Sequence, residues 1–210
     1  MNSETHFVTP INPKHKHAPK NALGELRLIG GQWKRTKLSF PLLQGLRPTP
    51  SRIRETLFNW LASDITRSKC LDLFAGSGAL GFEALSRGAQ KVWLVDESKI
   101  ICQNLTQHAE RLATTQATIM CGDALQPKTL AIDDVIDIVF CDPPFNQGYL
   151  NTLLPAIDSL NLADDALIYV ESEKKLSSLE CPANWHLLKE KSAGDVRYRL
   201  YQRHTIQGKT

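Results

Sequence analysis

The sequence predicts an α/β fold built on a mostly parallel sheet, because short apolar runs alternate with helical segments along most of the chain. The strands are expected at residues 70–74, 92–95, 118–121, 136–141 and 166–171, and the helices near residues 79–87, 99–112 and 149–160. Parallel strands need such crossover helices, which cover both faces of the sheet.

Two further strands close the predicted sheet. Residues 185–191 and 196–202 are joined by Ala193-Gly194-Asp195, which favours a terminal antiparallel hairpin. The α/β sheet is therefore expected to contain seven strands, of which the last runs antiparallel.

The chain is expected to begin with two segments that precede this sheet. Residues 1–22 have almost no apolar periodicity, which predicts a disordered tail. Residues 23–63 are expected to form a basic hairpin with a glycine turn, followed by a helix, and residues 64–205 the α/β domain. Thr49 or Ser51 is the expected N-cap of that helix, with Arg52 and Arg54 off its buried face.

Composition narrows the class of protein. The 210 residues are 42% hydrophobic and 22% charged, and no apolar run approaches the ~20 residues of a membrane-spanning helix. Cys70, Cys102, Cys121, Cys141 and Cys181 have no spacing typical of a metal site or a redox pair. We interpret them as small buried residues of a cytoplasmic protein with no metal and no membrane partner.

Charge is unevenly distributed along the chain. Residues 1–60 contain ten Lys and Arg against three Glu, whereas residues 61–210 contain fifteen against nineteen acids. This asymmetry indicates a basic face that meets a polyanion, although a solvated surface explains it equally well.

A glycine-rich segment follows the first predicted strand of the sheet. In residues 71–81, LDLFAGSGALG, Gly76, Gly78 and Gly81 match the dinucleotide-binding pattern, and Asp96 ends the next strand. Asp72, however, would place a negative charge beside a pyrophosphate. An acid there suits S-adenosylmethionine instead, which has no phosphate and carries an ammonium and a sulfonium.

The segment Asp142-Pro143-Pro144-Phe145 ends the fourth predicted strand. The prolines stiffen the loop and donate no hydrogen bonds, so Asp142 and the Pro143 carbonyl can each accept one hydrogen from an exocyclic amino group. Phe145 would stack on a flipped base. This arrangement favours methyl transfer to a nucleobase amine by positioning, without a strong general base.

Together these segments resemble the RsmD family of ribosomal RNA methyltransferases, and the similarity covers residues 24–203. Its distinguishing stretches include Ile29-Gly30-Gly31-Gln32-Trp33, Leu46-Arg47-Pro48-Thr49 and residues 196–201. The resemblance implies a Rossmann-like class I methyltransferase that modifies a guanine N2 amino group in 16S rRNA, within an assembled or assembling small ribosomal subunit.

The resemblance also implies roles for individual residues. The catalytic residues would be Asp142, Pro143, Pro144 and Phe145. The S-adenosylmethionine site would comprise Asp72, Phe74, Ala75, Gly76, Ser77, Gly78, Asp96, Glu97, Asp123 and Ala124, with Asp96 on the ribose and Asp123 on the adenine. The RNA phosphates would meet Lys34, Arg35, Lys37, Arg47, Arg52 and Arg54. The alternation of Arg197, Arg199 and Arg203 with apolar residues in the last strand favours a second cationic face, although a plain solvent face explains it equally well.

Three other interpretations remain open at this point. A DNA adenine methyltransferase could use the same Asp-Pro-Pro-Phe segment, since that segment suits any exocyclic amine. A dinucleotide-dependent oxidoreductase would use the glycine loop, with Asp96 as the ribose-binding acid. An RNA-binding protein without catalysis would need only the basic segment.

Overall fold

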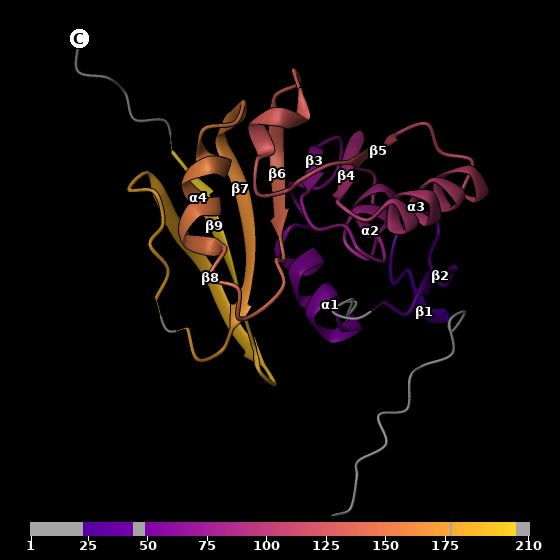
Figure 1. Cartoon of the computed structure of the whole chain (residues 1–210), viewed down its shortest axis with the longest axis horizontal. Coiled ribbons are helices and arrows are strands. Elements are labelled where there is room, and N and C mark those ends of the chain that lie inside the picture. Colours follow the sequence, from indigo (N-terminus) through magenta and orange to yellow (C-terminus); the bar gives the residue numbers. More distant parts are fainter. Residues whose placement is uncertain (1–22, 44–48, 177, 205–210) are drawn as a thin grey trace, which may run out of the picture.

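The computed structural model describes residues 23–43, 49–176 and 178–204 (Figure 1). The predicted tail at residues 1–22 and the predicted phosphate contact Arg47 lie outside the described residues. Among the helices that are described, none is both long and apolar enough to cross a membrane.

A seven-stranded sheet forms the centre of the molecule, with the strand order β5-β4-β3-β6-β7-β9-β8. Five neighbouring strands are parallel, whereas β9 runs antiparallel to both β7 and β8. The strands are β3 (Lys69–Asp72), β4 (Lys91–Asp96), β5 (Ala117–Cys121), β6 (Ile136–Cys141), β7 (Leu162–Glu173), β8 (Trp185–Ala193) and β9 (Val196–Arg203). The predicted fold class is confirmed, including the closing hairpin.

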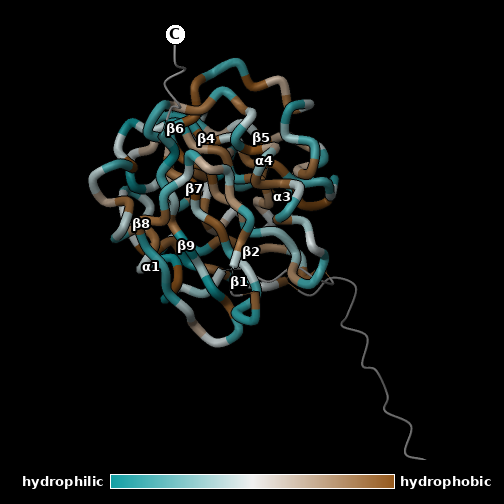
Figure 2. Tube along the Cα trace, turned by 90° about the vertical axis from the view of Figure 1, so that its left-hand side faces the viewer, coloured by the Kyte–Doolittle hydropathy of each residue, from teal (hydrophilic) through white to brown (hydrophobic). Residues whose placement is uncertain are grey.

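Helices cover both faces of this sheet. Apolar side chains of α1 (Ser51–Trp60), α2 (Gly81–Ser86) and α3 (Lys99–Arg111) pack with one face in one cluster. Side chains of α4 (Leu150–Asp158) and of the short 3₁₀ helix η1 (Pro127–Leu130) pack with the other face. The central strands are therefore buried on both sides, and Figure 2 shows the hydrophobic segments gathered toward the interior.

A small antiparallel sheet of β1 (Leu23–Arg27) and β2 (Lys37–Pro41) is attached to α2. The amide of Gln32 donates to the Ser86 carbonyl at 2.7 Å, and the Ser86 hydroxyl donates to the Gly30 carbonyl at 2.6 Å. Gly31 has φ +71°, and a Cβ there would lie 1.6 Å from the Ser86 carbonyl oxygen. The glycine turn is thus a docking contact, and Figure 1 shows α1, β1 and β2 together beneath α2 and α3.

The expectation that Arg54 lies off the buried face of α1 is wrong. Its side chain is 2% exposed, because the buried face of α1 consists of Ile53, Arg54, Leu57 and Phe58 and is therefore wider than the predicted apolar stripe. Its guanidinium donates to the carbonyls of Thr49 (3.2 Å) and Arg27 (3.0 Å), and Nη1 lies 3.6 Å from Glu83 Oε2. Arg54 therefore joins the hairpin, α1 and α2, and it is removed from the set of RNA contacts.

Two smaller expectations are also corrected. The N-cap of α1 is Pro50, and neither Thr49 nor Ser51 caps the helix through its side chain. Cys121 is exposed, because it ends the edge strand β5, whereas Cys70, Cys102 and Cys141 are buried.

The second cationic face is not formed either, because two of its arginines are paired with acids. Arg199 is buried and donates to Glu190 at 2.7 Å, and Arg203 donates to Asp158 at 3.1 Å. These ion pairs join β9 to neighbouring segments, and the paired acids offset the charge of both arginines.

Candidate active site

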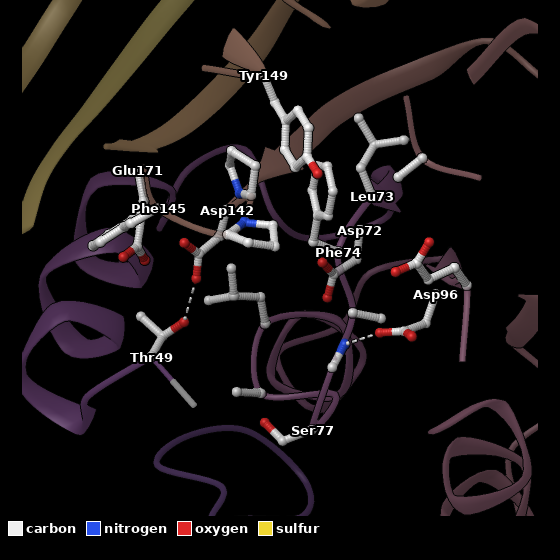
Figure 3. A pocket seen from close by; sticks show the side chains of 18 of the residues that line it. Thr49, Asp72, Leu73, Phe74, Ser77, Asp96, Asp142, Phe145, Tyr149 and Glu171 are labelled. Carbon is white, nitrogen blue, oxygen red and sulfur yellow. Dashed lines mark hydrogen bonds between the residues drawn. The ribbon is translucent and has the colours of Figure 1, made fainter. Parts of the chain in front are cut away.

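One cavity of about 350 Å³ lies at the carboxyl ends of the parallel strands. It is lined by residues that follow β3, β4, β5 and β6, by the end of β7 and by the start of α1. Open parallel sheets bind ligands at this edge, where the strand order reverses between β3 and β6. Figure 3 shows acidic side chains from several strands facing this cavity.

The glycine loop between β3 and α2 forms one wall. Phe74, Ala75, Gly76 and Ser77 line the cavity, as the sequence predicts, whereas Gly78 turns the loop with φ +76° without lining it. A side chain at Gly78 would collide with Phe82, since its Cβ would lie 2.5 Å from that ring. The turn therefore depends on glycine for both its backbone angle and its packing.

Asp96 anchors this loop. Its carboxylate accepts from the amides of Gly76 at 3.0 Å and Ser98 at 2.9 Å (Figure 3). Burial raises the pKa of Asp96, and these two amides oppose the rise. Asp96, Glu97, Asp123 and Ala124 all line the cavity, so the structure brings these predicted cofactor contacts together.

Asp72 is the most deeply buried acid of the loop, with 2% of its surface exposed. Its carboxylate accepts from the Gly81 amide at 3.0 Å. Burial raises the pKa of Asp72 to about 7, and the charges of Asp142 and Asp96 add to the rise. A buried acid of this kind is stabilised in its charged form by a cationic ligand.

The Asp142-Pro143-Pro144-Phe145 loop lies across the cavity from the glycine loop, and all four residues line it. Oδ2 of Asp142 accepts from the Thr49 hydroxyl at 3.3 Å. Burial raises the pKa of Asp142 to about 7, while this hydrogen bond lowers it. Thr49 thus connects the start of α1 to the predicted catalytic carboxyl.

Sequence reasoning missed three polar residues of the site, Thr49, Tyr149 and Glu171. Glu171 lies beside Asp142, because Cys141 pairs with Val170 in the parallel register of β6 and β7. The rule that selected Asp72, Asp96 and Asp142, an acid at the end of a parallel strand, also applies to Glu171. No comparable signal exists for Thr49, whose contact spans 93 positions of the chain.

The predicted RNA contacts lie on the surface of the N-terminal segment. Lys34, Arg35, Lys37 and Arg52 are exposed. Lys37 also forms an ion pair with Glu25 at 3.0 Å, a surface contact of little energetic weight.

The order of the strands and the chemistry of the cavity together define the class of protein. An antiparallel β9 inserted between β7 and β8 closes a sheet of the Rossmann-like methyltransferase type. The Asp-Pro-Pro-Phe segment adjoins the cavity that such a sheet uses for its ligand. The chain is therefore a Rossmann-like methyltransferase.

Comparison with known proteins specifies the family. The family model described as Conserved hypothetical protein 95 matches residues 26–202. Ribosomal RNA small subunit methyltransferase D of Escherichia coli K12 is 48% identical over 182 residues, covering 86% of this chain and 91% of the relative. The same-named Haemophilus influenzae protein is 45% identical, covering 87% and 96%. The solved structure of Escherichia coli yhhF superposes with a TM-score of 0.77 at 48% identity, covering 86% of this chain and 99% of that chain. This chain belongs to the RsmD family, as its motifs indicate.

Proposed function

We propose that this protein transfers a methyl group from S-adenosylmethionine to the N2 amino group of a guanine in small-subunit ribosomal RNA. The observation that carries the proposal is the composition of the cavity. The described residues lining it include six acids (Asp72, Asp96, Glu97, Asp123, Asp142 and Glu171) and no Lys or Arg. Such a site favours a cation and repels a pyrophosphate, which argues against the dinucleotide-dependent oxidoreductase.

The residues present fit S-adenosylmethionine. Asp72 offers a buried carboxylate to its positive methionine portion, and Asp96 retains free lone pairs for the ribose hydroxyls. Asp123 stands at the cavity edge for the adenine amino group, with Ala124 buried beside it. When bound, this cosubstrate supplies an electrophilic methyl group on a positively charged sulfur.

Asp142 and the Pro143 carbonyl are the groups that act on the substrate amine. An aromatic amine is a weak nucleophile, since its lone pair is delocalised into the ring. Two acceptors that each take one N–H hydrogen favour a pyramidal nitrogen and direct its lone pair toward the methyl donor. Phe145, partly exposed at the cavity, would hold the base by stacking, worth ~1–3 kcal/mol.

The substrate class follows from the surface charge and from the family. The relatives are named ribosomal RNA small subunit methyltransferase D, and residues 23–63 expose Lys34, Arg35, Lys37 and Arg52 beside the catalytic domain, which we place at residues 64–205. We assign the phosphate contacts to these four cations, and the substrate to RNA within an assembled or assembling small subunit in the cytoplasm. A DNA adenine methyltransferase is the second candidate, favoured only by the generality of Asp-Pro-Pro-Phe.

The decisive experiment replaces Asp142 with Asn. The variant is incubated with labelled S-adenosylmethionine and small ribosomal subunits that lack their modifications. We expect kcat to fall about 10²–10³-fold, because the amide keeps an acceptor oxygen but has no negative charge to stabilise the positive charge that develops on the amine nitrogen, while the Kd of S-adenosylmethionine measured by calorimetry changes little.

The matched control is Asp133→Asn, an exposed acid away from the cavity, which should keep the native rate. Nucleoside analysis of the wild-type product identifies the base. Label on adenine would contradict the guanine assignment, and a native rate for the Asp142 variant would contradict the mechanism.

A further inference from the structure

Glu171 is a buried acid to which the proposed chemistry assigns no role. It lies on β7 beside Asp142, and its side chain is 2% exposed although it lines the cavity. Figure 3 shows Glu171, Phe145, Asp142 and Thr49 at one end of the site, away from Asp96 and Ser77. Glu171 therefore stands where the substrate base, rather than the methyl donor, is expected.

A second hollow of about 370 Å³ adjoins this end of the cavity. The two share Pro143, Pro144, Phe145, Tyr149 and Glu171. Glu171 therefore lies at the junction between the space assigned to S-adenosylmethionine and a space lined by the stacking residue Phe145. A base that enters through the second hollow meets Glu171 together with Asp142.

The carboxyl group of Glu171 is incompletely satisfied within the described part of the protein. The Tyr169 hydroxyl donates to Oε1 at 2.7 Å, and Oε2 has no hydrogen-bond partner among the described residues. No described Lys or Arg forms an ion pair with it. Burial raises the pKa of Glu171 well above its ordinary value, and the nearby charge of Asp142 adds to this. Because Glu171 lines the cavity, its second oxygen is available to accept a hydrogen bond from a ligand there.

The Watson–Crick edge of guanine offers the complement. Guanine presents an N1–H donor directly beside its N2 amino group, whereas adenine presents an acceptor at N1 and cytosine an acceptor at N3. A donor such as N1–H favours the ionised form of a neighbouring carboxyl group, and that form only accepts hydrogen bonds, so it cannot pair with an acceptor at the same position. With Asp142 and the Pro143 carbonyl on the N2 hydrogens, a neighbouring carboxyl is suited to accept N1–H.

We infer that Glu171 is the residue that selects guanine, by accepting a hydrogen bond from N1–H of the target base while Asp142 holds its N2 amino group. This inference rests on the proposed function and assigns the base specificity to a residue outside the Asp-Pro-Pro-Phe segment. It also requires an unpaired or flipped guanine, because N1–H is occupied in a base pair.

The test changes the target base as well as the Glu171 side chain. Small subunits are reconstituted on ribosomal RNA that carries either guanine or 2-aminopurine at the modified position. 2-Aminopurine keeps the reactive N2 amino group but has an acceptor in place of N1–H. For the wild type, we expect kcat/KM for guanine to exceed that for 2-aminopurine by at least ~100-fold, since a site built for a donor rejects an analogue that lacks it.

Glu171→Gln should reduce this ratio to within ~10-fold, because an amide can accept from N1–H of guanine and donate to N1 of 2-aminopurine. Glu110→Gln, the same change on the exposed face of α3, is the matched control and should keep the wild-type ratio. Calorimetric binding of S-adenosylmethionine by both variants verifies that the fold and the donor site are intact.

Each outcome has a distinct meaning. If the wild type methylates both bases equally, or if Glu171→Gln keeps the full discrimination, the inference is wrong while the methyltransferase function stands. If the wild type methylates no guanine in the subunit, the proposed function itself fails. A second variant, Tyr169→Phe, removes only the hydroxyl partner of Glu171 and should retain the guanine preference, because the acceptor remains.

Discussion

At the scale of single residues, the site depends on a contact between Thr49 and Asp142. The Thr49 hydroxyl occupies Oδ2 of Asp142, so Oδ1 is left to accept from the substrate amine. The backbone carbonyl of Thr49 also accepts a hydrogen bond from the Arg54 guanidinium at 3.2 Å. This contact connects Thr49 to the buried polar network beneath α1. Thr49 is therefore a positioning residue for the predicted catalytic carboxyl.

Thr49→Val should lower kcat at pH 7 about 10-fold, the loss expected for one hydrogen bond to a charged group. Burial gives Asp142 a pKa of about 7, so the active carboxylate forms as pH rises through that value and the rate reaches a plateau above it. Because the Thr49 hydrogen bond lowers this pKa, its removal should move the rise in the pH–rate profile to higher pH. Thr49→Ser keeps the hydroxyl and should restore both the rate and the profile. A loss of rate that is equal at every pH would indicate a structural defect instead.

At the scale of elements, the hairpin and α1 are held to the catalytic domain by polar contacts to α2. Glu83 is fully buried, and its carboxylate accepts from the Ile29 amide at 2.8 Å and from Arg87 at 2.7 Å. Arg54 approaches the same carboxylate from α1. Three segments far apart in the sequence thus meet at one acid directly behind the glycine loop.

Glu83→Gln should lower the free energy of unfolding by about 3 kcal/mol, because it leaves the buried Arg54 charge without its counter-ion. Urea unfolding measures the change. Glu25→Gln, which breaks the exposed pair with Lys37, is the control and should stay within about 0.5 kcal/mol. Equal effects of the two substitutions would show that the Glu83 network does not stabilise the fold.

At the scale of the whole molecule, charge is separated between a basic surface segment and an acidic cavity. The cations that the sequence places in residues 1–60 include Lys34 and Arg35, which stay exposed in the turn between β1 and β2. Six of the nineteen acids in residues 61–210 line the cavity. We therefore expect RNA phosphates and a cationic methyl donor to meet opposite potentials on one protein.

Replacing Lys34 and Arg35 together with Gln should weaken RNA binding and reduce the slope of log K against log salt concentration by about 1.4–1.8, or ~0.7–0.9 for each lost phosphate contact. The control replaces two exposed cations on other elements, Arg111 and Lys128, and should leave the slope unchanged. The measurement is the RNA affinity of each variant, determined by filter binding at a series of salt concentrations. An unchanged slope for the Lys34 and Arg35 variant would remove them from the RNA interface.

The order of the elements and most of the cavity lining can be predicted from the sequence. Apolar periodicity located the strands, and strand-end acids such as Asp72 and Asp142 were identifiable because parallel strands end at one edge of a sheet. These features are local in the chain, so patterns of a few residues are sufficient to identify them.

Which cations are exposed, and which polar groups meet across the chain, could not be predicted without the packing of the folded protein. Arg52 and Arg54 are two positions apart on α1, yet one is exposed and the other lies between α1, the hairpin and α2. Thr49 reaches Asp142 across 93 positions, and Glu171 adjoins Asp142 through the register of β6 and β7. Burial and pairing of this kind depend on how distant segments pack. The periodicity of one segment does not identify the other segment that packs against it.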